Sequence, residues 1–182
     1  DPMPDVLELT PELTEVAAGL RFPEGPIAMP DGSIALVEMF GQRLTCVHPD
    51  GTTDTIAEIP GGPNGAAVGP DGAIYLCNNG GSFRAVELGD LLLPGGFDGD
   101  GYLGGRVQRV DPSNGSVTDL YTECDGRPLR APNDLVFDAH GGLWFTDHGI
   151  RNRAARTSDL TSIYYATANG SSITEVVHPV EA

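Results

Sequence analysis

Positively charged residues are scarce in this chain. Its 182 residues include 10 Lys and Arg against 26 Asp and Glu, which gives a formal net charge of −16. Binding to nucleic acid or to an anionic membrane needs basic patches that face the phosphates. The charge balance therefore excludes both as partners and favours a soluble protein that attracts cations. The cytoplasm is the expected compartment; the periplasm or secretion stays open, because a sequence starting at Asp1 leaves room for a removed signal peptide.

Cysteines are also few. Cys46, Cys77 and Cys124 are an odd number at irregular spacing, which is neither a disulfide framework nor a zinc-binding pattern. Cys46 and Cys77 lie within apolar stretches and are expected to be small core residues. No apolar run approaches the length of a membrane span. The sequence also lacks a serine nucleophile elbow and a phosphate-cradling glycine loop, so neither type of active site is expected.

Helical periodicity is missing from almost the whole chain. Only residues 86–93 are expected to hold a helical turn or two. Turn-forming residues are abundant instead, with 25 Gly and 15 Pro. Short β-branched and aromatic runs between such turns favour strands, so the expected fold class is all-β.

One sequence motif occurs three times, at residues 23–38, 63–78 and 132–147. Each copy has a Pro followed by Glu or Asn, an apolar strand, a turn containing Gly, and a second apolar strand that ends in an acid or an amide. A second pair of strands follows in each unit. These pairs are residues 43–47 with 52–56, 106–110 with 116–120, and 162–166 with 171–177.

Four short antiparallel strands in units of roughly 40–50 residues are typical of β-propeller blades. The sequence therefore predicts one β-propeller domain with blades at about 20–60, 61–130 and 131–182. The second blade is longer because residues 79–105 form a glycine-rich insert. This insert is either a functional loop on a rigid scaffold or a solvated surface insertion.

Three blades do not close a ring, because propellers typically have at least four. An open ring leaves a sheet edge and an apolar blade face bare at each end. Two arrangements are expected: the chain is half of a roughly six-bladed propeller, or two copies of it pair. The partner is then the second half of the propeller or a second copy. A lone strand within residues 5–18 is expected to precede the first blade.

The repeat places Glu24, Asn64 and Asn133 at equivalent positions, where each follows a Pro and starts the innermost strand of its blade. One carboxylate and two amide oxygens are then expected to converge on a central channel. Hard oxygen donors of mixed charge suit Ca²⁺ or Mg²⁺ more than Zn²⁺. An alternative for Asn64 is a local turn role, since it heads an Asn-Gly pair. Glu24 has no such turn role.

Further polar residues follow the second strands. Asn79, Asp147 and His148 are expected on the rim of the pocket or on the opposite side of the sheets, depending on strand length. His148 is either part of this site or a solvated loop residue. Arg130, just before the third Pro-Asn, is expected to reach an anionic or carbonyl oxygen of a ligand, or else to be an ordinary exposed Arg. Together with Asn64, these four form the expected substrate-binding set.

Residues 22–26, 63–65, 131–138 and 142–147 resemble the senescence-marker-protein/gluconolactonase/luciferin-regenerating-enzyme family in motif order and spacing. The resemblance covers roughly residues 18–182 and corresponds to the first half of the family pattern. It implies a six-bladed propeller with a divalent metal in its central channel, and the hydrolysis of sugar lactones. By position, Glu24 resembles the family's first metal ligand, and Asn133 the Asn that binds metal or substrate. Asn64 occupies the matching position of the second blade.

The family's later blades supply a further Asn and an Asp that is commonly assigned as the general base, and neither has a counterpart in this chain. The catalytic residue is therefore unknown. The resemblance implies a divalent-metal-dependent lactonase, or the N-terminal half of one, acting on a small-molecule lactone. Ca²⁺ is the expected metal, with Mg²⁺ or Zn²⁺ as alternatives. Two other functions stay open: a non-catalytic binding or scaffold propeller, and a phosphotriesterase-like hydrolase on the same metal site.

Overall fold

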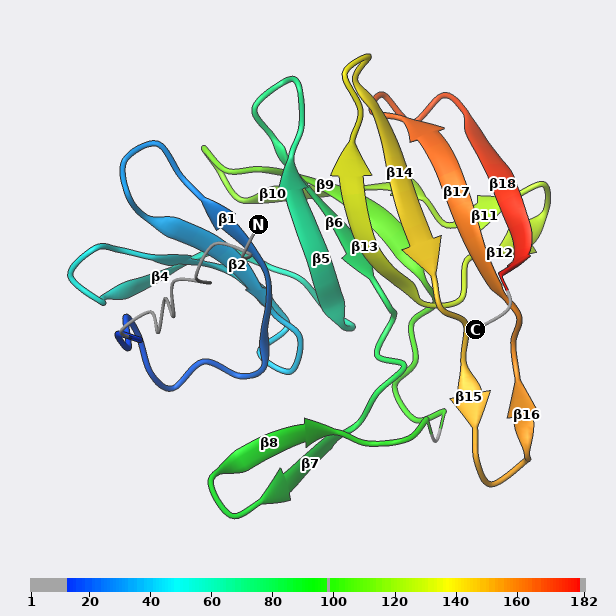
Figure 1. Cartoon of the computed structure of the whole chain (residues 1–182), viewed down its shortest axis with the longest axis horizontal. Coiled ribbons are helices and arrows are strands. Elements are labelled where there is room, and N and C mark those ends of the chain that lie inside the picture. Colours follow the sequence, from blue (N-terminus) through cyan, green and yellow to red (C-terminus); the bar gives the residue numbers. More distant parts are fainter. Residues whose placement is uncertain (1–12, 98, 181–182) are drawn as a thin grey trace, which may run out of the picture.

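The computed structural model describes residues 13–97 and 99–180, which form three four-stranded antiparallel sheets (Figure 1). We name them sheets one, two and three in chain order. Sheet one contains β1 (Pro23–Ala28), β2 (Ile34–Glu38), β3 (Arg43–Val47) and β4 (Thr53–Glu58). Sheet two contains β5 (Pro63–Val68), β6 (Ile74–Asn78), β9 (Arg106–Asp111) and β10 (Ser116–Tyr121). Sheet three contains β13 (Pro132–Phe137), β14 (Gly142–Asp147), β17 (Thr161–Thr167) and β18 (Ile173–Val180).

Three two-stranded hairpins lie outside these sheets. They are β7 (Ala85–Leu88) with β8 (Leu91–Pro94), β11 (Glu123–Cys124) with β12 (Arg127–Pro128), and β15 (Arg151–Asn152) with β16 (Thr157–Ser158). The described residues contain no helix, which confirms the expected all-β class. Accordingly, no helix in the part of the chain that the structure describes has the length and apolarity needed to cross a membrane.

One expectation about local structure is wrong. Residues 86–93 form the β7–β8 hairpin rather than helical turns, because Gly89 with φ of 60° reverses the chain between the two strands. The leading strand expected within residues 5–18 falls largely outside the described residues. Its described part, residues 13–18, is not a strand, and Leu13 is 91% exposed.

The three innermost strands, β1, β5 and β13, lie side by side (Figure 1). Each is followed by the same tight turn, in which an Asp side chain accepts a backbone N–H two residues on. The Asp residues are Asp31, Asp71 and Asp138, and each turn contains a Gly with φ between 78° and 85°. The repeated turn chemistry explains why three distant segments of the sequence fold into equivalent hairpins.

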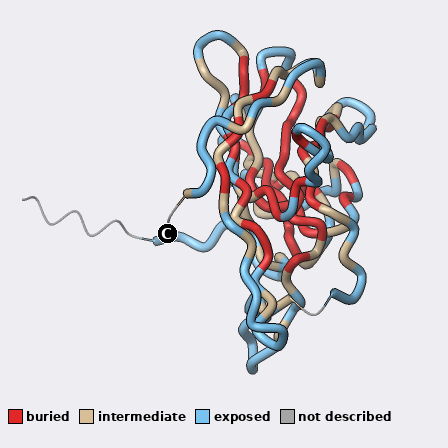
Figure 2. The backbone as a smooth tube through the Cα atoms, turned by 90° about the vertical axis from the view of Figure 1, so that its right-hand side faces the viewer, coloured by how far each residue is buried: buried red, intermediate tan, exposed pale blue. Residues whose placement is uncertain are grey.

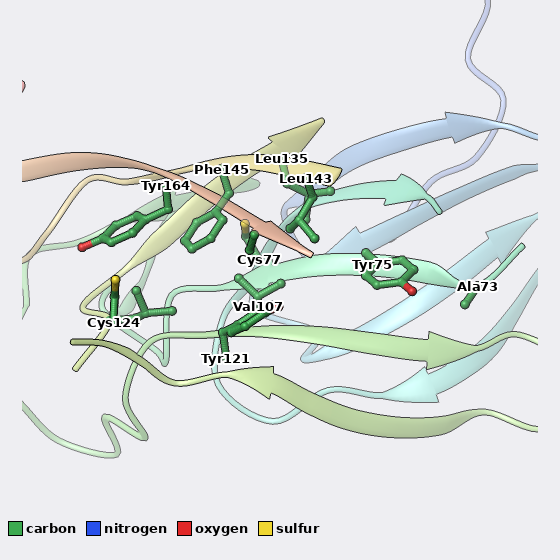
Figure 3. Close-up of a cluster of buried hydrophobic side chains, with 12 residues drawn as sticks. Ala73, Tyr75, Cys77, Val107, Tyr121, Cys124, Leu135, Leu143, Phe145 and Tyr164 are labelled. Carbon is green, nitrogen blue, oxygen red and sulfur yellow. The ribbon is translucent and has the colours of Figure 1, made fainter. Parts of the chain in front are cut away.

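Strand β6 is buried along its whole length because it lies between two apolar interfaces. Its alternate residues point to opposite faces, as the two-residue period of a strand requires. Ile74 and Leu76 pack in the core between sheets one and two. Tyr75 and Cys77 pack in the core between sheets two and three, and Figure 3 shows Phe145 beside Cys77 in this core. Figure 2 shows these buried segments grouped in the middle of the molecule, with exposed turns around them.

Sheet three has only one covered face. In β14, Leu143 and Phe145 are buried while Trp144 is 37% exposed. Val136 in the neighbouring β13 is 61% exposed on the same side. The side chains of Trp144 and Val136 therefore form an apolar face of sheet three. No other sheet in the described residues packs against this face.

Candidate functional site

The candidate residues of the first strands lie at β-bulges. In β5 and β13, two residues lie between consecutive paired positions, whereas one residue lies between their partners in the neighbouring strand. Strand β1 has the same irregularity between Glu24 and Ile27. A bulge turns side chains away from the regular alternation, and bulges are common beside active sites. Asn64 and Asn133 lie within the bulges of β5 and β13.

We name Glu24, Asn64 and Asn133 the axial row, because they start the three adjacent inner strands. The structure brings two of them into direct contact: Asn64 Nδ2 donates a hydrogen bond of 2.8 Å to Asn133 Oδ1. Asn64 is 9% exposed, whereas Glu24 and Asn133 are half-buried. The Glu24 carboxylate forms no hydrogen bond or ion pair with any described residue.

Glycines let the inner strands approach this closely. Gly25 has φ of 52°, and a side chain there would bring its Cβ within 2.9 Å of the Asn64 carbonyl oxygen. A Cβ at Gly65 would lie 2.8 Å from the Asn133 carbonyl oxygen and would collide with Asp134. Such contacts are too short for real side chains, so the Glu-Gly and Asn-Gly pairs of the sequence are a packing requirement at the junctions between the sheets.

A second row of polar residues ends the second strands. We name Glu38, Asn78 and Asp147 the clamp row. Each pairs with the Pro that starts the first strand of its sheet, so both rows lie at the same end of the sheets. For Asp147 this rules out the opposite side of the sheets, one of its two expected places.

Asp147 is 4% exposed, and both of its carboxylate oxygens accept backbone hydrogen bonds. Oδ2 accepts from the Arg130 N–H at 2.7 Å, and Oδ1 accepts from the Ala131 and Gly149 N–H groups at 2.8 and 2.9 Å. These bonds hold the segment that enters β13 against the segment that leaves β14. The carboxylate therefore has no oxygen without a protein donor.

Asn78 has the equivalent structural role in sheet two, where it binds the segments that enter β5 and leave β6. Its Oδ1 accepts from the Gly62 and Gly80 N–H groups, both at 2.9 Å, and its Nδ2 donates to the Pro60 carbonyl and to Gln108 Oε1. All of its hydrogen-bonding groups are thus used within the protein, and its side chain is fully buried.

Glu38 is the clamp of sheet one. Its buried carboxylate accepts from Arg43 Nε at 2.8 Å, from Thr45 Oγ1 at 2.7 Å and from the Arg21 N–H at 2.7 Å. Burial acts to raise the pKa of Glu38, but these donors stabilise the ionised form more strongly, and the pKa is lowered below its ordinary value.

Two further residues of the expected substrate-binding set have protein partners. Asn79 is fully buried, and its Oδ1 accepts from the Gly81 and Ser82 N–H groups at the start of the insert. The Arg130 guanidinium donates to Asp159 Oδ2 at 2.7 Å and lies 5.9 Å from the ring centre of Tyr102.

His148 lines a hollow between the insert and the β14–β17 connection, and no axial-row residue lines this hollow. Its ring packs against Phe83 with a centroid distance of 5.5 Å. Sequence reasoning did not single out the other polar residues of this hollow, which are Ser82, Arg84, Arg151 and Arg153. The signal that was available is the presence of several arginines in a strongly acidic chain.

The axial row fits a hard cation in part. Its free oxygen donors are the Glu24 carboxylate, the Asn64 amide oxygen and the remaining lone pair of Asn133 Oδ1. Carboxylate and amide oxygens are ligands of Ca²⁺ and Mg²⁺. Within the described residues no three His, Cys, Asp or Glu side chains form a metal-binding group. The chain therefore supplies a partial donor set.

Known proteins that are similar to this chain in sequence or structure include lactonases. The chain is 24% identical over 152 residues to a lactonase, drp35, of Staphylococcus epidermidis, covering 82% of this chain and 39% of the relative. A gluconolactonase from Xanthomonas campestris superposes with a TM-score of 0.65 at 21% identity, covering 89% of this chain and 49% of that protein. The calcium-binding protein regucalcin of Agrobacterium tumefaciens gives a TM-score of 0.58 at 18% identity, with coverages of 90% and 45%. The chain thus spans less than half the length of these proteins.

The two structural likenesses show a shared fold. The model of the SMP-30/gluconolactonase/LRE-like family matches residues 22–182, which include the axial row, the clamp row and the insert. This match extends over nearly the whole described chain. The chain belongs to the SMP-30/gluconolactonase/LRE-like family.

Proposed function

We propose that this chain supplies the first half of the active site of a divalent-metal-dependent lactonase that acts on sugar lactones. The observation that carries the proposal is the axial row: an unpaired Glu24 carboxylate and the bonded Asn64–Asn133 pair, at the starts of three adjacent inner strands. Family membership and the lactonase names of the relatives support the reaction class.

Glu24 and Asn133 would hold the metal, with Ca²⁺ favoured by the oxygen donors and by the likeness to a calcium-binding protein. When bound, such a cation polarises the lactone carbonyl and stabilises the negative charge that develops on its oxygen. Asn64 orients Asn133 through their hydrogen bond of 2.8 Å, which fixes the direction of the Asn133 oxygen. The clamp row keeps the first strands in register, so the axial oxygens stay in place.

The remaining parts of the site lie in further blades, which we propose complete a six-bladed ring. The bare face of sheet three, with Val136 and Trp144, supports this proposal, as does the coverage of less than half of the relatives. The further blades come from a second half of the protein or from a second copy of the chain. Sedimentation velocity over a range of concentrations tests the second case. A cooperatively folding monomer of 19.1 kDa would contradict the need for closure.

The test of function uses the complete protein, with all blades present, and the variant Glu24→Gln. We expect the variant to lose tightly bound metal and at least about 100-fold in lactone hydrolysis, because charge stabilisation at such sites is worth several kcal/mol. Glu58→Gln, which changes an exposed Glu at the end of β4, is the matched control and should retain activity.

Two assays separate the alternatives. Gluconolactone and a phosphotriester are offered to the same preparation, and bound metal is measured by atomic emission. Hydrolysis of the phosphotriester alone would favour a phosphotriesterase. Unchanged lactone hydrolysis in Glu24→Gln would show that Glu24 has no part in the reaction, and an inactive, metal-free complete protein would favour a scaffold role.

A further inference from the structure

The hollow beside His148 has walls from two separate segments of the chain. The first wall is residues 82–84 and 94–97 of the insert, and the second is residues 148–151 with Arg153 and Thr161. Its volume is about 640 Å³, within the range of small-molecule sites. Both hairpins, β7–β8 and β15–β16, extend from the same end of the sheets (Figure 1). Contact between Phe83 and His148 joins the two walls.

The charge of this hollow is opposite to that of the chain. Arg84, Arg151 and Arg153 line it, and no Asp or Glu of the described residues does. All 10 basic residues of the chain are arginines, and they stand against 26 acidic residues. Three arginines among lining residues that include no acid are therefore a strong local concentration of positive charge. Most other arginines, such as Arg43 and Arg109, are paired with carboxylates.

The guanidinium groups of Arg84, Arg151 and Arg153 form no hydrogen bond or ion pair with any described residue. The Asp159 carboxylate, in the β14–β17 connection, accepts from Arg130 Nε at 2.7 Å and from the Ile150 N–H at 3.1 Å. Its charge is therefore already compensated. The donors of the three arginines remain available to a ligand.

Two buried polar atoms at the hollow also have no partner. Ser82 is 4% exposed, and its Oγ makes no hydrogen bond in the structure. His148 Nδ1 lies 2.7 Å from the Gly149 carbonyl oxygen, which only accepts, so the ring nitrogen that donates is Nδ1. The buried Nε2 of the same ring has no partner. Buried polar atoms without partners are rare and costly, so they point to a missing ligand.

One wall is shaped so that an arginine can lie along it. A Cβ at Gly95 would come within 2.7 Å of Arg84 Cγ and within 3.0 Å of Arg84 Nε. Gly95 also donates its N–H to the Arg84 carbonyl oxygen at 2.7 Å. The absence of a side chain at Gly95 thus lets the Arg84 side chain run across the end of the β7–β8 hairpin.

We propose that the hollow is a binding site for a small organic anion, whose carboxylate or phosphate group contacts the three arginines and Ser82 Oγ. The fork of a guanidinium group matches both kinds of oxyanion. The volume exceeds that of an inorganic ion, and Phe83 and Phe97 line the site, so the ligand carries a carbon skeleton beside its charged group. No axial-row residue is among the lining residues of the hollow, and the proposal does not depend on lactone hydrolysis.

The test is isothermal titration of the full chain with gluconate, with inorganic phosphate and with glucose, at low ionic strength. We expect at least one of the two anions to bind, and glucose not to bind. The triple variant Arg84→Gln, Arg151→Gln, Arg153→Gln should lose at least tenfold in affinity for that anion. Arg156→Gln is the matched control, because Arg156 lies in the β15–β16 turn, is exposed and does not line the hollow. It should change the affinity less than twofold.

Ser82→Ala gives a second measurement that does not depend on charge. Its hydroxyl has no partner in the folded protein, so its removal should leave the thermal midpoint unchanged while it weakens anion binding several-fold. Gluconate binding without phosphate binding identifies a carboxylate site, and the reverse identifies a phosphate site. Binding of neither anion, or equal affinity in the triple variant and the unaltered chain, would overturn the proposal.

Discussion

The axial row and the clamp row both consist of acids and amides at the same end of the sheets, yet they differ in how their oxygens are used. In the clamp row every carboxylate oxygen accepts from the protein, as both oxygens of Asp147 do. In the axial row Glu24 has no partner among the described residues, and Asn64 and Asn133 share one bond. Oxygens that accept hydrogen bonds from the protein stabilise the fold, whereas oxygens without a protein donor are available to a ligand.

The difference follows from position in the strand pair. Clamp residues lie opposite the leading Pro of each first strand, where the incoming chain presents N–H groups that need acceptors. Axial residues come one position after that Pro, at the bulges. There each inner strand lies against another inner strand. A shift of one residue thus separates a structural role from a candidate binding role.

The largest effect is expected for Asp147→Ala. This change leaves the N–H groups of Arg130, Ala131 and Gly149 without acceptors in a buried place. Each unsatisfied group costs about 1–3 kcal/mol, so the free energy of unfolding should fall by at least about 3 kcal/mol. Urea unfolding measures this, and the soluble yield gives a second readout if the variant does not fold.

Two further variants sharpen that result. Asp147→Asn keeps one acceptor oxygen and should lose about half as much stability. Asp90→Ala removes an exposed Asp of the β7–β8 turn, whose carboxylate bonds to no described residue, and should stay within about 0.5 kcal/mol of the unaltered chain. An Asp147→Ala variant that is as stable as Asp90→Ala would show that the clamp does not stabilise sheet three.

A smaller effect is expected from acid at Glu38. Its pKa in the folded state is lowered, because Arg43, the Arg21 N–H and Thr45 outweigh the opposing effect of burial. The resulting stabilisation is fully present above the pKa of Glu38 in the unfolded chain, and it is lost as the pH falls through the lower pKa of the folded state. The stability difference between the unaltered chain and Glu38→Gln should therefore shrink between pH 7 and about 3. A difference that stays constant or grows toward low pH would contradict the assignment.

How much the sequence could predict depends on how local the cause is. The repeated sequence motif places Glu24, Asn64 and Asn133 at equivalent strand starts. This could be predicted because Pro, Gly and Asx residues determine the backbone conformation of turns only a few residues long. The roles of Glu38 and Asp147 could not be read in this way, since a backbone donor to each of them lies 17 residues earlier in the chain. They appear only when the antiparallel register is known.

The insert shows the same limit. The apolar run around Leu91–Pro94 resembles a helical turn in isolation, but the Gly89-Asp90 turn and pairing with residues 85–88 make it a hairpin. The anion hollow lay beyond sequence reasoning, because Arg84 and Arg151 are 67 residues apart in number and meet only when both connections extend from one end of the sheets. No local pattern marks that meeting.

Within the axial row, Asn64→Ala should have a moderate effect on stability. It removes the only hydrogen bond between the inner strands' side chains that the described residues show, from Asn64 Nδ2 to Asn133 Oδ1. One neutral hydrogen bond contributes about 0.5–1.5 kcal/mol, which is the loss we expect in urea unfolding. Asn114→Ala, in an exposed turn, is the control. A loss above about 3 kcal/mol would place Asn64 with the clamp row instead.

The smallest effect on stability is expected for Glu24→Gln. Gln has the shape of Glu and removes only the charge, and the Glu24 carboxylate has no partner in the described structure that depends on that charge. The free energy of unfolding should therefore change by less than about 0.5 kcal/mol in metal-free buffer. The same change at Glu38 separates the carboxylate from Arg43 and should cost about 1.5–3 kcal/mol, because hydrogen bonds to charged groups are the stronger ones. Urea unfolding of the two variants side by side compares the rows directly. Equal losses would mean that Glu24 is a structural carboxylate, and the distinction between the two rows would fail.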